Sequence, residues 1–218
     1  MLKQIFPNLF FFQSPSEGSN VFLIAGKNPA LIDSSSKSNA SLLKSSIEKA
    51  GFDCNEIRLV LHTHGHADHF GCDFLFPNAE IWMHEFDAKF VNLKDAVFTF
   101  ANCIPADFPK ICSFFREKQI IDLGNFKLKV LFTPGHTKGS VCFFDGKNKL
   151  LFSGDTLFSG GVGRADLPSG NPAELKASLE KISKLKFNFL LPGHGEILQG
   201  GQKANVQFAL KSLGNSFL

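Results

Sequence analysis

Short apolar runs alternate with polar turns along the first third of this chain. The runs cover residues 9–12, 20–25 and 30–33, and the segments between them are rich in serine, glycine, asparagine and proline. Runs of this length, bounded by turn-forming residues, predict β-strands. Further strands are predicted over 57–61, 79–83 and 187–191, with three or four more between 119 and 153.

A longer apolar pattern over residues 38–50 has the period of a helix. Leu42, Leu43, Ile47 and Ala50 recur at helical spacing, and Gly51 supplies a stop signal. We therefore predict an amphipathic helix with these four side chains on its apolar face.

A second helix is predicted to begin at Pro172. Asn171 is a favoured capping residue, and proline suits the first turn because the backbone N–H that it lacks would be unpaired there. The apolar positions that recur at helical spacing are Leu175, Leu179 and Ile182. A last helix is predicted over 204–213.

Strand groups and helices therefore occur twice, and no linker or low-complexity segment divides the chain. Its 218 residues are enough for one large core, so we predict a single domain over 1–218. The apolar content of 44% and the charged content of 20% are ordinary for a globular protein. On this pattern alone, a purely parallel βα sheet would also fit.

Charge and cysteine usage limit the classes of function. The formal net charge is +3 and the lysines are scattered, which argues against nucleic acid or a membrane surface as a partner. The five cysteines are odd in number and show no paired spacing, so we expect reduced thiols. No apolar stretch reaches transmembrane length and the first residues do not form a signal peptide, so we predict a cytoplasmic protein.

The most unusual local composition follows the predicted strand 57–61. Four histidines and an aspartate stand within eight residues, at His62, His64, His66, Asp68 and His69. Neutral imidazoles and carboxylates are ligands that suit zinc, iron or manganese. His64 and His66 are two residues apart and project to the same side of an extended loop, whereas Asp68 and His69 follow where the chain should turn. We interpret this run as half of a dinuclear metal site.

Three other predicted strands end in a small or turn-forming residue that is followed by a possible ligand. These ligands are His136, Asp155 and His194. Folds of the α/β class usually gather their sites at the carboxyl ends of strands. Two more histidines and an aspartate able to bridge would complete two coordination spheres and leave a position for water.

These motifs resemble those of the metallo-β-lactamase-fold hydrolases. The matching runs are 63–69 (THGHADH), 134–137 (PGHT), 153–156 (SGDT) and 192–195 (PGHG), in the family's order. The runs 154–158 (GDTLF) and 163–168 (GRADLP) are most similar to its compact glyoxalase II-like branch. The resemblance covers nearly the whole chain and implies an α/β fold, in which two mixed β-sheets flanked by helices form an αββα four-layer sandwich.

The resemblance also implies two divalent metal ions and the set of residues that binds them. The first ion would be held by His64, His66 and His136, the second by Asp68, His69 and His194, and Asp155 would bridge them. Zinc is the expected metal, with iron and manganese as alternatives.

Such a site would hydrolyse an activated carbonyl compound. Metal coordination lowers the pKa of water towards ~7, so a hydroxide can attack at neutral pH, and Asp68 would orient it as a catalytic residue. Because the chain has no tyrosine, a metal ion rather than a phenol would stabilise the oxyanion. The resemblance implies a thioester of the S-2-hydroxyacylglutathione type as the small-molecule substrate.

The thiol carrier of that substrate stays open. Larger glyoxalase II enzymes hold glutathione with a C-terminal helical domain, and few residues follow His194 here. Arg164 lies at a position where glyoxalase II-like enzymes contact the glutathione part, so we expect it to bind a substrate carboxylate. An ion pair with Asp166 is the alternative for Arg164. Asp33 matches an aspartate that supports the metal loop from the second shell, although a simple helix cap would also explain it.

Other functions are compatible with parts of this pattern. Persulfide dioxygenases look similar and bind one iron at the positions of His64, His136 and Asp155. A lactonase or β-lactamase would use the same dinuclear site, although a lactonase that needs a tyrosine is disfavoured. A non-catalytic metal-binding domain is disfavoured by the complete ligand set, and the sequence carries no signal for the oligomeric state.

Three features stand outside this scheme. Residues 93–117 contain several phenylalanines without sustained periodicity; we favour core packing for them over a lid or aromatic wall at the site. We expect His62 to be a hydrogen-bonded core residue. The position of His84 is explained equally well if it begins a helix.

Overall fold

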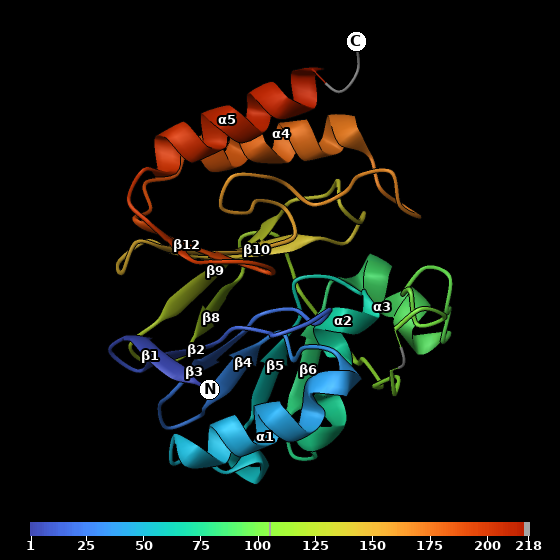
Figure 1. Cartoon of the computed structure of the whole chain (residues 1–218), viewed down its shortest axis with the longest axis vertical. Coiled ribbons are helices and arrows are strands. Elements are labelled where there is room, and N and C mark those ends of the chain that lie inside the picture. The colour runs from blue at the N-terminus through green and yellow to red at the C-terminus, as the bar shows by residue number, and fades with distance from the viewer. Residues whose placement is uncertain (105, 216–218) are drawn as a thin grey trace.

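Two β-sheets pack face to face in the computed structural model, and helices cover their outer faces (Figure 1). The structure describes residues 1–104 and 106–215; residue 105 and residues 216–218 of the predicted domain lie outside them. Helix α1 (Ala40–Lys49) covers one sheet, and helices α4 (Pro172–Ser183) and α5 (Gln202–Asn215) cover the other. The predicted αββα sandwich is therefore confirmed, and the purely parallel alternative is wrong.

The first sheet has seven strands in sequential order, antiparallel from β1 to β4 and parallel from β4 to β7. Its strands are β1 (Lys3–Phe6), β2 (Leu9–Phe12), β3 (Val21–Ile24), β4 (Ala30–Ile32), β5 (Leu59–Leu61), β6 (Glu80–Met83) and β7 (Ser113–Phe114). Because β4 and β5 run parallel, the two chain segments that follow them leave the sheet at the same edge.

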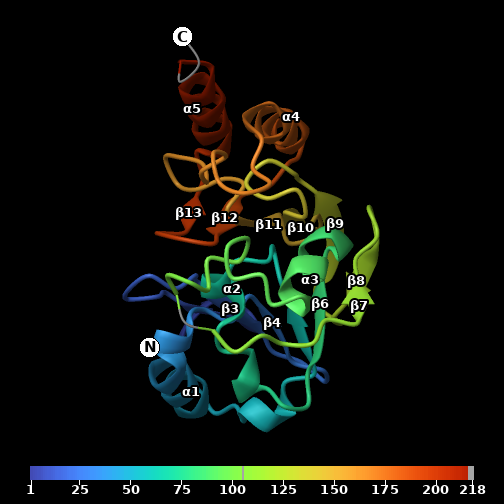
Figure 2. The ribbon, with the colours of Figure 1, turned by 90° about the vertical axis from the view of Figure 1, so that its right-hand side faces the viewer.

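The second sheet has six strands in the order β13-β12-β11-β10-β9-β8, and β11 and β12 form its parallel pair. Its strands are β8 (Ile120–Asp122), β9 (Lys127–Phe132), β10 (Val141–Asp145), β11 (Leu150–Gly154), β12 (Phe189–Pro192) and β13 (Leu198–Gln199). Two short α-helices, α2 (Ala67–Phe70) and α3 (Glu85–Asn92), lie side by side at one end of the sandwich (Figure 2). Short 3₁₀ helices span Lys37–Asn39, Cys54–Glu56 and Asp73–Leu75.

Alternation along the strands explains why each apolar run is almost continuous. In β3, Phe22 packs into the core between the sheets, whereas Val21 and Leu23 pack towards α1. In β11, Phe152 faces the inter-sheet core and Leu151 packs towards α4. A strand covered on both faces needs apolar residues at every position, so the sequence shows a run rather than a period of two.

Aromatic contacts join the two sheets directly. The ring of Phe22 meets that of Phe152 edge to face with centroids 5.3 Å apart, and Phe115 meets Phe143 in the same way at 5.3 Å. Each fully buried phenylalanine contributes about 1.5–3 kcal/mol of transfer free energy. Several of the phenylalanines thus fill the space between the sheets.

The predicted helices are present, with one correction to the first. Leu43 and Ile47 of α1 are buried, but Leu42 is 44% exposed, so its predicted place on the apolar face is wrong. Leu42 lies about 100° from Leu43 around the helix axis, outside the narrow buried face. The cap at Asn171 is confirmed, since its side chain accepts hydrogen bonds from two backbone N–H groups of α4. Within the described residues, no helix combines the length and the apolar character needed to cross a membrane.

Candidate metal centre

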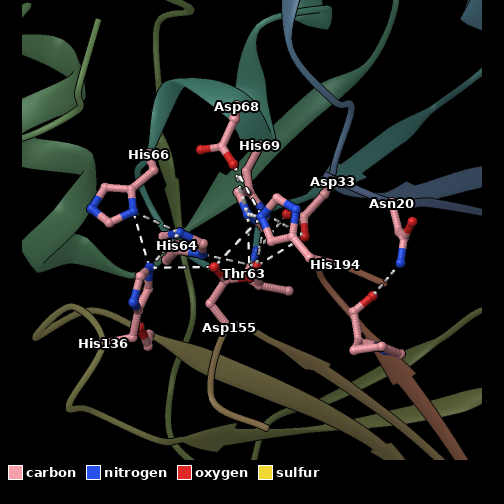
Figure 3. A network of polar contacts seen from close by, with 12 residues as sticks. Asn20, Asp33, Thr63, His64, His66, Asp68, His69, His136, Asp155 and His194 are labelled. Atoms are coloured by element: carbon pink, nitrogen blue, oxygen red, sulfur yellow. Dashed lines mark hydrogen bonds and ion pairs between the residues drawn. The ribbon is translucent and has the colours of Figure 1, made fainter. Parts of the chain in front are cut away.

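The carboxyl ends of strands from both sheets meet at one edge of the sandwich. Strand β5 leads into the loop with His64 and His66, and α2 follows with Asp68 and His69. From the second sheet, the segments after β9, β11 and β12 bring His136, Asp155 and His194. Figure 3 shows these seven side chains pointing toward one another. The structure therefore brings together every predicted ligand.

Three imidazoles form a first ligand group. His66 Nδ1 lies 3.0 Å from His64 Nε2 and 3.0 Å from His136 Nε2, and the latter two nitrogens are 3.2 Å apart. All three side chains are buried, and burial together with the neighbouring imidazoles lowers the pKa of His64 and, to about 3, that of His66. Both rings are thus neutral at pH 7, which is the form that binds a cation.

A second ligand group lies beside the first. His194 Nε2 is 3.1 Å from Asp68 Oδ2 and 3.3 Å from His69 Nε2. Asp155 lies between the groups: its Oδ2 is 3.5 Å from His136 Nε2, and its Oδ1 is 3.4 Å from His69 Nε2. One carboxylate therefore faces both groups, as a bridging ligand must.

The geometry fits metal ions of the expected size. Around a tetrahedral ion with bonds of about 2.0–2.1 Å, neighbouring ligand atoms lie about 3.3 Å apart. The ligand atoms of the first group are 3.0–3.2 Å apart. Asp155 Oδ1 is buried and, within the described part of the chain, has no hydrogen-bond partner. A buried carboxylate oxygen without a donor is costly unless a cation completes the site.

The outer nitrogens of three of the predicted ligand histidines have partners that fix the rings. His69 Nδ1 faces Asp33 Oδ2 at 2.9 Å, and His64 Nδ1 faces Thr63 Oγ1 at 3.2 Å. His136 Nδ1 faces the backbone oxygen of Arg164 at 2.7 Å. A proton held on the outer nitrogen leaves the lone pair of the inner nitrogen for a metal.

Asp33 also holds the backbone of the metal loop. Its Oδ1 accepts a hydrogen bond from the N–H of Thr63, and its Oδ2 accepts one from the Thr63 hydroxyl, both at 2.9 Å. Asp33 adopts a left-handed backbone with φ of 56°, a conformation that aspartate tolerates better than most residues. Burial alone would raise the pKa of Asp33, but His69 and His62 outweigh it and lower the pKa to about 2.

His62 is a fully buried partner of two aspartates. Its Nε2 lies 2.8 Å from Asp73 Oδ2, and its Nδ1 lies 3.5 Å from Asp33 Oδ1. Burial alone would lower the pKa of His62, but the two carboxylates outweigh it and raise the pKa to about 9. His62 is thus the hydrogen-bonded core residue that was expected, and it compensates the charge of the aspartate behind the ligands. Asp73 was not identified from the sequence, because no spacing rule connects it to Asp33.

His84 and residues 93–117 lie near the site in different ways. His84 caps α3, as its sequence position indicated. In the segment 93–117, which is described apart from residue 105, Phe98 is buried, and the ring centroid of the half-buried Phe100 lies 5.1 Å from that of His66. The segment therefore combines the core packing that we favoured with an aromatic contact to one ligand.

The side chain of Arg164 lies at the surface, paired with Asp166. Its Nε and Nη2 donate to the two carboxylate oxygens of Asp166 at 3.0 and 2.7 Å, and the side chain is 68% exposed. The structure thus shows the ion pair that was the alternative for Arg164. The contact of Arg164 with the predicted ligands is made by its backbone oxygen, which lies at hydrogen-bond distance from His136 Nδ1.

The fold and this site define a class of protein: the chain belongs to the metallo-beta-lactamase superfamily. The sequence profile of that superfamily matches residues 15–194. The centre is accordingly that of a metal-dependent hydrolase, with a His/Asp cluster that suits a pair of divalent ions.

Individual members of the superfamily are similar to most of this chain. A probable metallo-hydrolase of Methanocaldococcus jannaschii is 32% identical over 82% of this chain and 88% of its own length. The hydroxyacylglutathione hydrolase GloC of Haemophilus influenzae is 33% identical over 81% of this chain and 84% of its own length. The solved structure of TTHA1623 in a di-iron-bound form has a TM-score of 0.74 and 28% identity, covering 96% of this chain and 100% of that one.

Proposed function

We propose that this protein hydrolyses thioesters of the S-2-hydroxyacylglutathione class with two divalent metal ions, most simply zinc. The observation that carries the proposal is the convergence of five imidazoles and two carboxylates at one edge of the sheets. The similarity to a hydroxyacylglutathione hydrolase over most of both chains supports the substrate class.

The proposed ligands divide as the two groups do. The first ion would be held by His64, His66 and His136, the second by Asp68, His69 and His194, and Asp155 would serve both. When bound, the ions supply Lewis acidity at the carbonyl oxygen and make water a nucleophile at neutral pH.

Asp68 is the residue that we assign to orienting the water. Its carboxylate stands at the start of α2, 3.1 Å from His194, and its side chain is 13% exposed, so one edge faces the open side of the centre. Burial alone would raise the pKa of Asp68, but His69 and His194 outweigh it and lower it. Asp68 is therefore ionised at neutral pH and can accept a hydrogen bond from the attacking water.

Arg164 is proposed to bind a carboxylate of the substrate by exchanging its partner. An exposed ion pair contributes only about 0–1 kcal/mol, so the guanidinium can leave Asp166 for a substrate carboxylate at little cost. We expect Arg164→Ala to raise KM for S-lactoylglutathione up to about 5-fold and to leave kcat unchanged, since binding is lost equally in ground and transition states. The measurement is steady-state kinetics against an S-lactoyl thioester of a neutral thiol, whose KM should not move. Asp166→Asn is the matched variant and should lower KM slightly; an unchanged KM in Arg164→Ala would remove Arg164 from the site.

The assay that tests the function measures metal content and turnover together. We expect about two metal ions per chain and release of free thiol from S-lactoylglutathione. Oxygen consumption with a glutathione persulfide, in a protein that holds a single iron, would instead indicate a dioxygenase. Turnover of a lactone or β-lactam at a higher kcat/KM than the thioester would also contradict the proposal.

A further inference from the structure

Asp87 in helix α3 is a buried carboxylate that makes no hydrogen bond or ion pair with any of the proposed ligand side chains. It is 0% exposed, and its Oδ2 accepts hydrogen bonds from the N–H of Gly65 at 2.9 Å and from the hydroxyl of Thr137 at 2.7 Å. Its Oδ1 accepts a third hydrogen bond from the N–H of Gly139 at 2.9 Å. All three donors are neutral, so directional hydrogen bonds, rather than an ion pair, hold the carboxylate in place.

These three donors belong to the two loops that carry the first ligand group. Gly65 stands between His64 and His66, and Thr137 directly follows His136. The loops come from different sheets, yet their ligand nitrogens lie 3.0–3.2 Å apart. The carboxylate of Asp87 is thus a link between the two backbones that bear all three ligands.

Close contacts with the Asp87 side chain also restrict Gly139 and Gly65. A Cβ at position 139 would lie 2.3 Å from Asp87 Oδ1, which no side chain allows. A Cβ at position 65 would lie 3.0 Å from Asp87 Cβ. Both loops therefore approach Asp87 closely, and at position 139 any side chain would force a shift.

Burial makes this arrangement costly. It raises the pKa of Asp87 to about 6, against the effect of the three hydrogen bonds. A neutral apolar side chain would pack α3 without that cost, but it would leave the N–H groups of Gly65 and Gly139 without their buried acceptor. The carboxylate is therefore better explained by the loops that it joins than by the packing of the helix.

We propose that Asp87 is a positioning residue that sets the spacing of His64, His66 and His136 by joining their two loops, and thereby fixes the metal affinity of this group alone. The proposal rests on the metal-binding part of the proposed function and not on its substrate. Partners behind the ligands of a metal site typically change its affinity about 10–100-fold when they are replaced.

Asn20 provides the contrast, because it holds the loop of the second group in a similar way. Its Nδ2 donates to the backbone oxygens of Pro192 at 3.0 Å and Gly195 at 2.9 Å, on either side of His194. Its own N–H donates to the oxygen of Gly193 at 2.7 Å. Asn20→Ala should therefore weaken the second group and spare the first.

The test measures zinc affinity in backgrounds that retain one group each. In the full-length protein, His194→Ala leaves the first group intact and His136→Ala leaves the second. Metal-free protein is titrated with Zn²⁺ in competition with a coloured chelator. Adding Asp87→Asn, which keeps the volume of the side chain, should weaken zinc binding about 10–100-fold in the His194→Ala background and less than about 3-fold in the other. Asn20→Ala should give the reverse pattern.

Two conservative variants of Thr137 keep the proposal testable if Asp87→Asn does not fold. Thr137→Val removes one of the three hydrogen bonds at constant volume and should weaken the first group, whereas Thr137→Ser keeps the hydroxyl and should not. Because Asp87→Asn and Thr137→Val break the same link, the double variant should lose less binding free energy for zinc than the two single variants lose in sum. Equal weakening of both groups by Asp87→Asn, in step with a lower melting temperature, would mean a purely structural role and would overturn the proposal. So would unchanged affinity in the Thr137→Val variant. Either result could occur with thioester hydrolysis intact, so this failure is distinct from a wrong substrate.

Discussion

Replacing Asp155 with asparagine is expected to lower kcat/KM for thioester hydrolysis by about three to four orders of magnitude. The two oxygens of Asp155 face different histidines, His136 at 3.5 Å and His69 at 3.4 Å. An amide keeps one oxygen, turns the other position into a donor and removes the negative charge between two cations. Loss of a bridging ligand should forfeit about 4–5 kcal/mol of transition-state stabilisation, and each 1.36 kcal/mol is tenfold in rate.

The measurement combines steady-state kinetics on S-lactoylglutathione with metal analysis of the same preparation. Asparagine has nearly the volume of aspartate, so the fold should be retained, and circular dichroism verifies this. Asp122→Asn, which alters an exposed carboxylate on β8 that pairs with Lys127, is the control and should leave activity unchanged. Full activity and two metal ions per chain in Asp155→Asn would falsify the bridging role.

Removing the metal with a chelator should abolish hydrolysis and lower the melting temperature by about 8–16 °C. The native chain gathers seven ligands that the unfolded chain scatters, so a metal ion binds the folded state preferentially. At a free concentration 1,000 times the Kd, such a ligand adds about 4 kcal/mol of stability. For a domain of this size, each kcal/mol corresponds to about 2–4 °C.

Thermal unfolding with and without chelator measures this effect, and added zinc should restore both activity and melting temperature. A double variant with one ligand removed from each group, His64→Ala with His69→Ala, is the control in which the chelator should have no further effect. A metal-free protein that melts at the same temperature and turns over at the same rate as the loaded one would rule out the proposed centre.

The elements that the sequence predicted well are those whose burial leaves a local pattern. The strands over β2, β3 and β4 are buried on both faces, so their apolar runs are unmistakable. The edge strands β1 and β13 carry exposed polar residues such as Lys3 and Gln199, so nothing in their sequence distinguishes them from turns. They form strands because β2 and β12 provide backbone hydrogen-bond partners for them, and their own residues do not reveal this.

The proposed ligands could be predicted because metal chemistry restricts residue type and spacing. His64 and His66 must stand two apart to grip one ion from an extended loop, and His194 must follow a strand end to reach the same edge of the fold. The residues that hold these ligands obey no such rule. Asp73, Asp87 and Asn20 act on segments 11 to 175 positions away, through one to three hydrogen bonds each.

By itself, the sequence predicted which side chains could bind cations, which strands lead into the segments that carry them, and the family to which the chain belongs. The tertiary structure alone decided that His62 lies between two buried aspartates, and that Asp87 and Asn20 hydrogen-bond to the loops that carry the two predicted ligand groups. The physical reason is the range of the interactions. Ligand spacing and strand burial act over a few residues and leave periodic traces, whereas a buried hydrogen bond between distant loops depends on where the whole chain brings its backbone.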